Sequence, residues 1–215
     1  MYSDKNYKLD LILNNHINFD FGKYFERGWE IFIKNIGLYI AFSAVFIGIF
    51  LINSLIAAGI PGGNSILNMI TTPPLTAGLY LAIYYSTKSK INFSKFFDGF
   101  NYFIPLLIYS VISSIFIFIG VFALVIPAIY LSVAYAFSIF FIVFHKLDFW
   151  QAMEYSRKII TKKWWSFFGL FLVLGLLNAV GAFFMLIGVL FTLPFSYCVI
   201  YAAYEDIILN NNIEQ

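Results

Sequence analysis

Six residues inside long apolar stretches are the ones whose types could do chemistry in this chain: Pro74, Pro127, Pro194, Asn53, Asn178 and Tyr130. A proline removes one backbone donor, so three kinked helices around a shared cavity could present free carbonyl groups to a ligand. The same prolines could instead shape helix packing, or occupy the first turn of a helix, where the missing N–H does no harm. Asparagines in apolar stretches more often form hydrogen bonds between helices. We therefore treat the six residues as a candidate cavity, and structural roles as the simpler interpretation.

Residue sets that support catalysis are missing from the sequence. His16 and His145 lack the paired spacing of metal ligands. Cys198, the single cysteine, is flanked by apolar residues, so we expect a packed, inert thiol. No nucleotide-binding, metalloprotease or serine-hydrolase motif occurs in a convincing setting. We therefore predict no enzymatic activity, no metal site and no cofactor.

The distribution of charge predicts the elements that carry these residues. Hydrophobic residues make up 61% of the 215 residues and charged residues only 11%, whereas a soluble domain has about 25% charged residues. Uncharged stretches of 53, 47 and 41 residues occupy positions 35–87, 99–145 and 164–204. One membrane crossing needs about 20 residues, so each stretch is long enough for two. We predict an all-α integral membrane protein with six transmembrane helices in one membrane domain, 1–215.

Breaker residues place the turn within each stretch. The turns are expected at 59–64, near 120–127 and near 181–188, where glycine and proline gather. Pro127 and Pro194 lie close enough to these turns for a first-turn role. For the third stretch, a re-entrant pair that does not cross the membrane is the alternative.

All 13 lysines and arginines lie outside the uncharged stretches, in 1–34, 88–98 and 146–163. Positively charged loops are retained in the cytoplasm. The sequence therefore predicts a multi-pass protein of the bacterial inner (cytoplasmic) membrane with both termini in the cytoplasm.

A pattern of charged segment, uncharged hairpin and proline in the second half of the hairpin occurs three times, in 17–87, 91–145 and 147–209. Each unit contains two predicted crossings, so successive units point the same way. We expect three repeats of an interfacial amphipathic helix plus a helical hairpin, related by a pseudo-threefold axis along the membrane normal.

The charged segments have the spacing of amphipathic helices at the membrane surface. In the second segment, Phe93, Phe96, Phe97 and Phe100 are predicted to share one face, and Asp148 is a predicted N-cap for the helix of the third. The expected interfacial anchors are Trp29, Phe97, Trp150, Trp164 and Trp165. Anchoring in the headgroup layer is the simpler interpretation, and a docking surface for a partner is the alternative.

Several short motifs resemble a group of uncharacterised bacterial six-helix inner-membrane proteins, similar to the membrane domain of glycerophosphoryl diester phosphodiesterases. They are Gly28-Trp29 with Lys34-Asn35, Ala152 to Ser156 through Trp164-Trp165, Gly188 to Pro194, and Tyr201 to Asp206. The resemblance implies the same six-helix fold. It does not carry over the diesterase activity, because no soluble stretch exceeds about 35 residues, too few for a separate catalytic domain.

These observations predict a non-enzymatic accessory or scaffold subunit of the membrane that organises lipids or partners. A transporter or binder of a lipid-like or apolar solute is the alternative function. The expected partners are membrane lipids and other membrane-protein subunits. Nucleic acid is not expected, because the net charge is only +2 and no polybasic tail stands apart from the spans.

Overall fold

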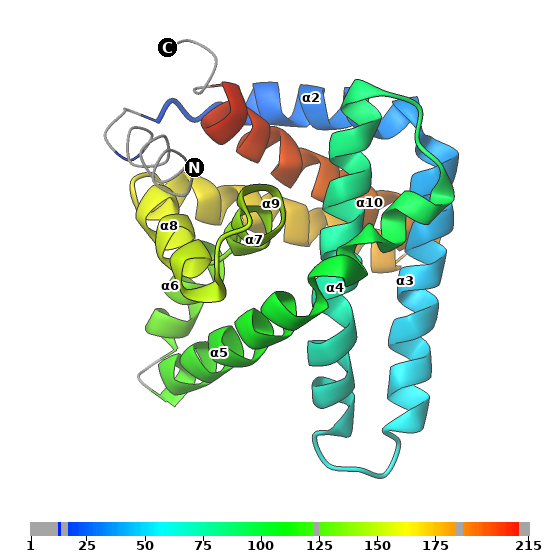
Figure 1. Cartoon of the computed structure of the whole chain (residues 1–215), viewed down its shortest axis with the longest axis vertical. Helices are drawn as coiled ribbons and strands as arrows, with labels where there is room; N and C mark the ends of the chain where they lie inside the picture. Colours follow the sequence, from blue (N-terminus) through cyan, green and yellow to red (C-terminus); the bar gives the residue numbers. More distant parts are fainter. Residues whose placement is uncertain (1–12, 14–16, 123–124, 184–186, 211–215) are drawn as a thin grey trace.

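The computed structural model describes Leu13 and residues 17–122, 125–183 and 187–210 (Figure 1). These residues form helices and turns, and no strand is present among them. Six helical segments are long and apolar enough to cross a membrane: Ile36–Ile56, Gly63–Lys88, Phe93–Phe122, Ile126–His145, Trp164–Phe183 and Ile187–Leu209. The predicted all-α class and the six apolar helices inferred from the uncharged stretches are therefore confirmed.

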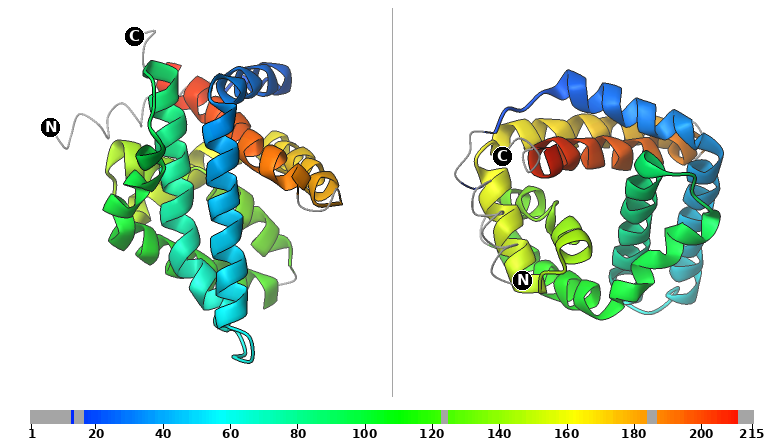
Figure 2. Two further views of the ribbon diagram at one scale, coloured as in Figure 1. Left: turned by 90° about the vertical axis from the view of Figure 1, so that its right-hand side faces the viewer. Right: turned by 45° about the horizontal axis from the view of Figure 1, so that its top comes forward.

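The apolar helices are arranged as three hairpins, and the chain reverses in or next to each predicted turn region. Their helices are α3 (Ile36–Ile56) and α4 (Gly63–Lys88), α5 (Phe103–Phe122) with α6 (Ile126–Ala134) and α7 (Ser138–His145), and α9 (Trp164–Phe183) with α10 (Ile187–Tyr204). Figures 1 and 2 show the hairpins splayed apart, with the α3–α4 hairpin projecting beyond the others.

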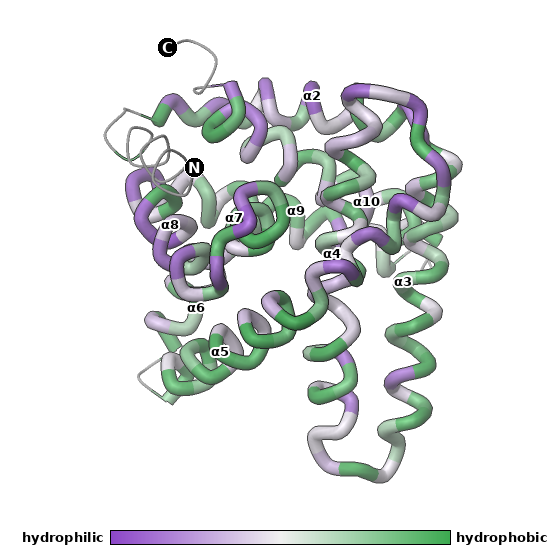
Figure 3. The backbone as a smooth tube through the Cα atoms, viewed as in Figure 1, coloured by the Kyte–Doolittle hydropathy of each residue, from purple (hydrophilic) through white to green (hydrophobic). Residues whose placement is uncertain are grey.

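Polar and charged residues gather in the remaining elements, which are α2 (Phe21–Lys34), η1 (Phe93–Tyr102), α8 (Phe149–Thr161) and the π-helical turn η2 (Glu205–Leu209). Figure 3 shows the hydrophilic parts of the trace mainly in these elements, whereas the long helices are mostly hydrophobic. The carboxylate of Asp148 accepts hydrogen bonds from the backbone N–H groups of Trp150 and Gln151 at 2.9 and 3.0 Å. The predicted N-cap of α8 is thereby confirmed.

The segment η1 differs from the predicted amphipathic α-helix. It is a 3₁₀ helix that runs directly into α5. Because residues three apart share a face of a 3₁₀ helix, Phe96 and Gly99 are buried, whereas Phe97 and Phe100 are 37% and 45% exposed. The prediction that all four phenylalanines of this segment share one face is therefore wrong, because it assumed 3.6 residues per turn.

The second helix of each hairpin is more buried than the first. In the most apolar 18 residues of Ile36–Ile56, Phe93–Phe122 and Trp164–Phe183, 22% of residues are buried in each case. The corresponding values for the second helices are 61%, 56% and 44%. The helices α4, α6–α7 and α10 therefore form the inside of the bundle, and α3, α5 and α9 lie around them.

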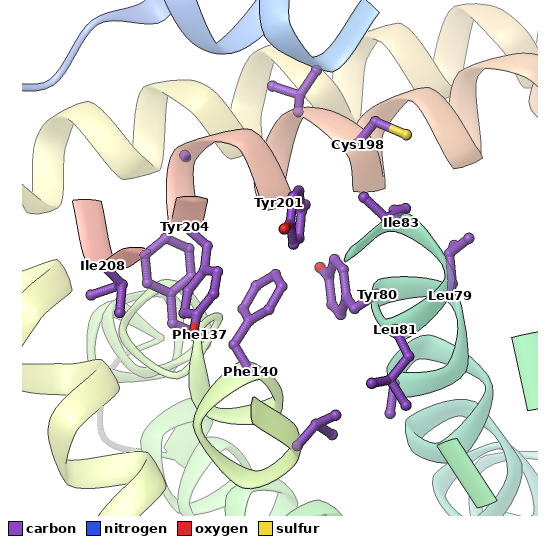
Figure 4. Packing of buried hydrophobic residues seen from close by; sticks show 14 of the residues in the cluster. Leu79, Tyr80, Leu81, Ile83, Phe137, Phe140, Cys198, Tyr201, Tyr204 and Ile208 are labelled. Atoms are coloured by element: carbon purple, nitrogen blue, oxygen red, sulfur yellow. The ribbon is translucent and has the colours of Figure 1, made fainter. Parts of the chain in front are cut away.

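The inner helices meet in a cluster of aromatic rings. The ring centroid of Phe140 in α7 lies 4.1 Å from that of Tyr80 in α4 and 4.3 Å from that of Tyr204 in α10, on which it stacks (Figure 4). All three side chains are buried. Such ring pairs contribute about 0.5–1.5 kcal/mol beyond their area burial. This cluster therefore joins the three hairpins.

A break separates α6 from α7, and Ser156 of α8 bridges it. The Ser156 hydroxyl donates to the carbonyl oxygen of Ala134 at 2.6 Å and accepts from the backbone N–H of Phe137 at 3.0 Å. Buried backbone groups without a partner are costly, so this one side chain stabilises the break and holds α8 against it.

Three glycines allow backbones to touch. A Cβ built on Gly78 of α4 would clash with the carbonyl oxygen of Phe96 and lie 2.8 Å from its carbonyl carbon. A Cβ on Gly99 would lie 2.9 Å from the Cα of Gly78. At Gly28 of α2, an added Cβ would lie 2.9 Å from the Cα of Val199 in α10. The elements η1 and α2 therefore sit directly on the inner helices, as small residues permit.

Candidate functional site

The prolines of α4 free a backbone carbonyl that α5 then satisfies. Pro73 has no N–H to donate to the carbonyl of Met69, one turn earlier. The Ser110 hydroxyl of α5 donates to that oxygen at 2.8 Å. Pro73 and Pro74 are both buried. The carbonyl freed by Pro73, next to the predicted Pro74, therefore serves contact between the first and second hairpins.

Asn53 belongs to a ladder of polar side chains between α3 and α4. Its Nδ2 donates to Oδ1 of Asn68 and to Oγ1 of Thr71, both at 2.9 Å. Nδ2 of Asn68 donates in turn to Oδ1 of Asn64 at 2.8 Å. These groups find their partners within one hairpin, as expected for hydrogen bonding between membrane helices.

Pro127 and Tyr130 both lie in α6, in different roles. Pro127 is in the first turn of the helix, where its missing N–H does no harm. The hydroxyl of Tyr130 is hydrogen-bonded with Oγ1 of Thr161 at 2.7 Å, and its ring stacks on Trp164 with a centroid distance of 6.1 Å. Tyr130 therefore links α6 to the end of α8 and the start of α9.

Pro194 lies inside α10, so the first-turn role suggested by its closeness to the predicted turn does not apply. Asn178 of α9 is bonded to side chains on both sides of this proline. Its Nδ2 donates to the Ser196 hydroxyl at 2.8 Å, and its Oδ1 accepts from the Thr192 hydroxyl at 3.0 Å. These bonds join α9 to α10 around the proline.

A groove of about 380 Å³ lies between α9 and α10 and includes Asn178 in its lining. Most of the lining side chains are apolar, among them Phe171, Leu193 and Ile200. Its size falls in the range of small-molecule sites, about 300–1,000 Å³. The six predicted cavity residues are distributed over the three hairpins and do not share this groove. Among them, Asn178 lines it.

The predicted interfacial anchors lie in the surface elements and at the start of α9. Trp29, Trp150 and Trp165 are 53%, 56% and 78% exposed. Phe97 is exposed on η1, and Trp164 is half-buried against Tyr130. The first three indoles are therefore available to headgroups or to a partner. The histidine at position 16 lies outside the described residues, and Cys198 is buried.

A charged cleft of about 310 Å³ lies between α2 and the π-helical turn η2. Arg27 donates from Nε to Oε2 of Glu205 at 2.9 Å and from Nη1 to Oε2 of Glu30 at 3.1 Å, and Lys23 pairs with Asp206. The hydrogen bond to Glu205 raises the pKa of Arg27 above its ordinary value. The cleft is therefore lined by paired charges, unlike the apolar groove.

An adjoining pocket of about 240 Å³ shares Arg27 and Glu30 with this cleft and reaches the end of α4. Nζ of Lys34 donates to the carbonyl oxygen of Ser86 at 2.7 Å. A cation bonded to a terminal carbonyl stabilises the C-terminal end of a helix. α2 is therefore tied to the ends of two inner helices, α4 and α10.

This cleft was not expected from the sequence. The available signal was weak: Lys23 and Arg27 are spaced by four on α2, and Glu205 and Asp206 are the first charged residues after the third uncharged stretch. Complementary charge alone does not select these partners among the other charged residues.

The chain was compared with protein-family models, curated proteins and solved structures, and no match was found in any of the three. These comparisons do not link the chain to the membrane domain of glycerophosphoryl diester phosphodiesterases, so that resemblance stays a prediction. Among the described residues, no group of three or more His, Cys, Asp or Glu side chains has an arrangement that could hold a metal ion.

Proposed function

We propose that the chain is a non-enzymatic, polytopic protein of the bacterial inner membrane, an accessory or scaffold subunit that organises lipids or partner subunits. The placement of its polar groups carries the proposal. The asparagines of α3 and α9 are bonded within their own hairpins, whereas charged residues line a cleft along α2 at the surface. Such a surface suits contact with headgroups and partner subunits.

The proposal includes the cytoplasmic location of both termini and the threefold repeat. The ion pair between Lys23 and Asp206 supports a common side for the two ends of the described chain. The alternation of less and more buried helices through the three hairpins supports the repeat. The likeness to six-helix inner-membrane domains belongs to the same proposal.

Cysteine labelling tests the orientation. In a Cys198→Ala background, Ile60→Cys places a thiol in the turn of the first hairpin. Lys90→Cys places one at the opposite end of the same hairpin, just after α4 ends at Lys88. A membrane-impermeant maleimide should label the Ile60→Cys variant in intact spheroplasts, and the Lys90→Cys variant only after lysis. Labelling of both positions in intact spheroplasts would contradict the orientation.

Co-purification in native nanodiscs tests the scaffold role. A membrane subunit should accompany the wild type in a fixed ratio. Glu30→Lys reverses a charge that lines both pockets and should release that subunit. Lys88→Glu, which reverses a charge outside their linings, should retain it. Repeated purification of the wild type without a stoichiometric partner would count against the scaffold role.

A binder or transporter of a lipid-like or apolar solute is the second candidate function. The groove between α9 and α10 favours it, because the groove is mostly apolar and its walls belong to two helices that are long and apolar enough to cross a membrane. Retention of lipid by the purified protein in native mass spectrometry tests this function. A wild-type protein that carries no lipid would refute it.

A further inference from the structure

The groove on the third hairpin has the length of one bilayer leaflet. On α10 its lining extends from Val189 to Ile200, which is about 16 Å at 1.5 Å per residue. This length is close to half of a hydrocarbon core about 30 Å thick. An occupant that follows the groove therefore has the reach of a single lipid chain.

The groove suits a narrow occupant. A volume of about 380 Å³ spread over about 16 Å gives a mean cross-section of roughly 24 Å². A helix with side chains is about 10 Å wide, which corresponds to roughly 80 Å². An extended hydrocarbon chain is therefore narrow enough to lie inside the groove along its whole length, whereas a helix of a second copy or of a partner subunit could only lie across its opening.

The polar groups at the groove require no polar ligand. Nδ2 of Asn178 donates to the Leu174 carbonyl and to the Ser196 hydroxyl, each at 2.8 Å. Its Oδ1 accepts from Thr192, and the Ser196 hydroxyl donates to the Thr192 carbonyl at 2.7 Å. Both Nδ2 hydrogens of Asn178 and the hydroxyl hydrogens of Thr192 and Ser196 are used in these bonds, and an apolar chain leaves all of the bonds in place.

The groove lies nearer to the turn end of the hairpin than to its charged end. On α10 the lining begins at Val189, two residues after the first described residue of the helix, and stops five residues before Glu205. On α9 it begins eight residues after Lys163. Charged residues at the ends of spans mark the headgroup level. The groove therefore begins close to the membrane surface reached by the turn of the hairpin, and it ends before the opposite surface, which is reached by Lys163 and Glu205.

We propose that this groove binds one acyl chain of a membrane lipid from the leaflet on the turn side of the spans. The inference rests on the second candidate function, the binding of a lipid-like ligand, and adds to it the site, the bound part of the molecule and the leaflet. The carbonyl end of the chain lies near Val189, and its terminal methyl lies near Ile200.

A matched pair of glycine substitutions tests the site. Gly175 lines the groove, and Gly48 lies in the middle of α3; a Cβ added at either position meets no heavy atom within 4 Å. Gly175→Phe therefore fills the groove without a clash at Cβ, and Gly48→Phe adds the same ring to a different helix. Equal thermal unfolding of the two variants in nanodiscs shows that both are folded.

The probe is phosphatidylglycerol with a diazirine at the end of one acyl chain, in phosphatidylglycerol nanodiscs. The peptide containing Ile200 should be labelled in the wild type. Filling a hydrophobic pocket by even one small group changes binding by about tenfold or more, so Gly175→Phe should lower this labelling about tenfold. Gly48→Phe should leave it unchanged. Equal labelling of the wild type and the Gly175→Phe variant would overturn the proposed site.

A second probe tests the leaflet. With the diazirine next to the chain carbonyl, labelling should move to the peptide containing Val189. The reverse pattern, with the carbonyl probe near Ile200, would overturn the leaflet assignment. If native mass spectrometry finds retained lipid while Gly175→Phe leaves labelling unchanged, the groove inference fails and lipid binding stands. If the wild type retains no lipid, lipid binding fails as well.

Discussion

Replacing Gly78 by alanine should weaken the attachment of η1 to α4. The added Cβ would lie 2.8 Å from the carbonyl carbon of Phe96 and would clash with its oxygen. The optimal separation of two carbon atoms is about 3.5–4.0 Å. Both obstructing atoms belong to the backbone, so no side-chain rotation removes the clash, and the two elements must move apart by about 1 Å.

The expected loss of stability at Gly78 is the difference between two effects. Alanine in a helix interior is about 1 kcal/mol more favourable than glycine. Overpacking in a close-packed site costs about 1–3 kcal/mol, and a backbone clash belongs at the upper end of this range. The net loss should be about 2 kcal/mol, which lowers the folded-to-unfolded ratio about thirtyfold.

Reversible unfolding in mixed detergent micelles, followed by tryptophan fluorescence, measures this loss. Gly48→Ala is the matched control, because a Cβ at Gly48 in α3 meets nothing within 4 Å, and it should stabilise the protein by up to about 1 kcal/mol. Gly99→Ala should reproduce the loss seen for Gly78→Ala. A Gly78→Ala variant as stable as the wild type would refute the proposed backbone contact.

Two further changes test individual contacts. Ser110→Ala removes the donor to the Met69 carbonyl and should lower the free energy of unfolding by about 1–2 kcal/mol in the same assay. Ser114→Ala, on the exposed side of α5, is the control and should cost little. Equal losses of stability in the two variants would argue against the role of the Ser110 hydroxyl. The hydrogen bond from Arg157 lowers the pKa of Glu154 below its ordinary value of 4.5. The contribution of this ion pair to the free energy of unfolding is therefore present above that pH and is lost as the pH falls below it. Unfolding measured between pH 6 and pH 3 should show that Glu154→Gln weakens the acid dependence, and an unchanged pH profile would contradict the assignment.

The six apolar helices could be predicted because hydropathy acts on each residue separately. A charged side chain is unfavourable in hydrocarbon wherever it occurs along a span, so the three uncharged stretches marked the hairpins without any knowledge of contacts. The N-cap at Asp148 was predictable for a similar reason, since its partners Trp150 and Gln151 are only two and three residues away.

The face of η1 could not be predicted in the same way. Its phenylalanine spacing is compatible with two helical periods, and the choice between them was made by packing. Gly99 comes into backbone contact with Gly78 of α4, and the 3₁₀ period places Phe96 and Gly99 on that side together. The burial of these two residues, and the exposure of Phe97, therefore depended on a helix that lies elsewhere in the sequence.

The sequence by itself determined where the chain can cross a membrane, where it turns and which segments carry charge, because these properties depend on residues close together along the chain. The tertiary structure decided which partner each polar group has. Ser110 meets the carbonyl freed by Pro73, and Arg27 meets Glu205, only after separate helices have packed. A hydrogen bond requires two groups within about 3 Å, and for residues far apart in the chain only folding sets that distance.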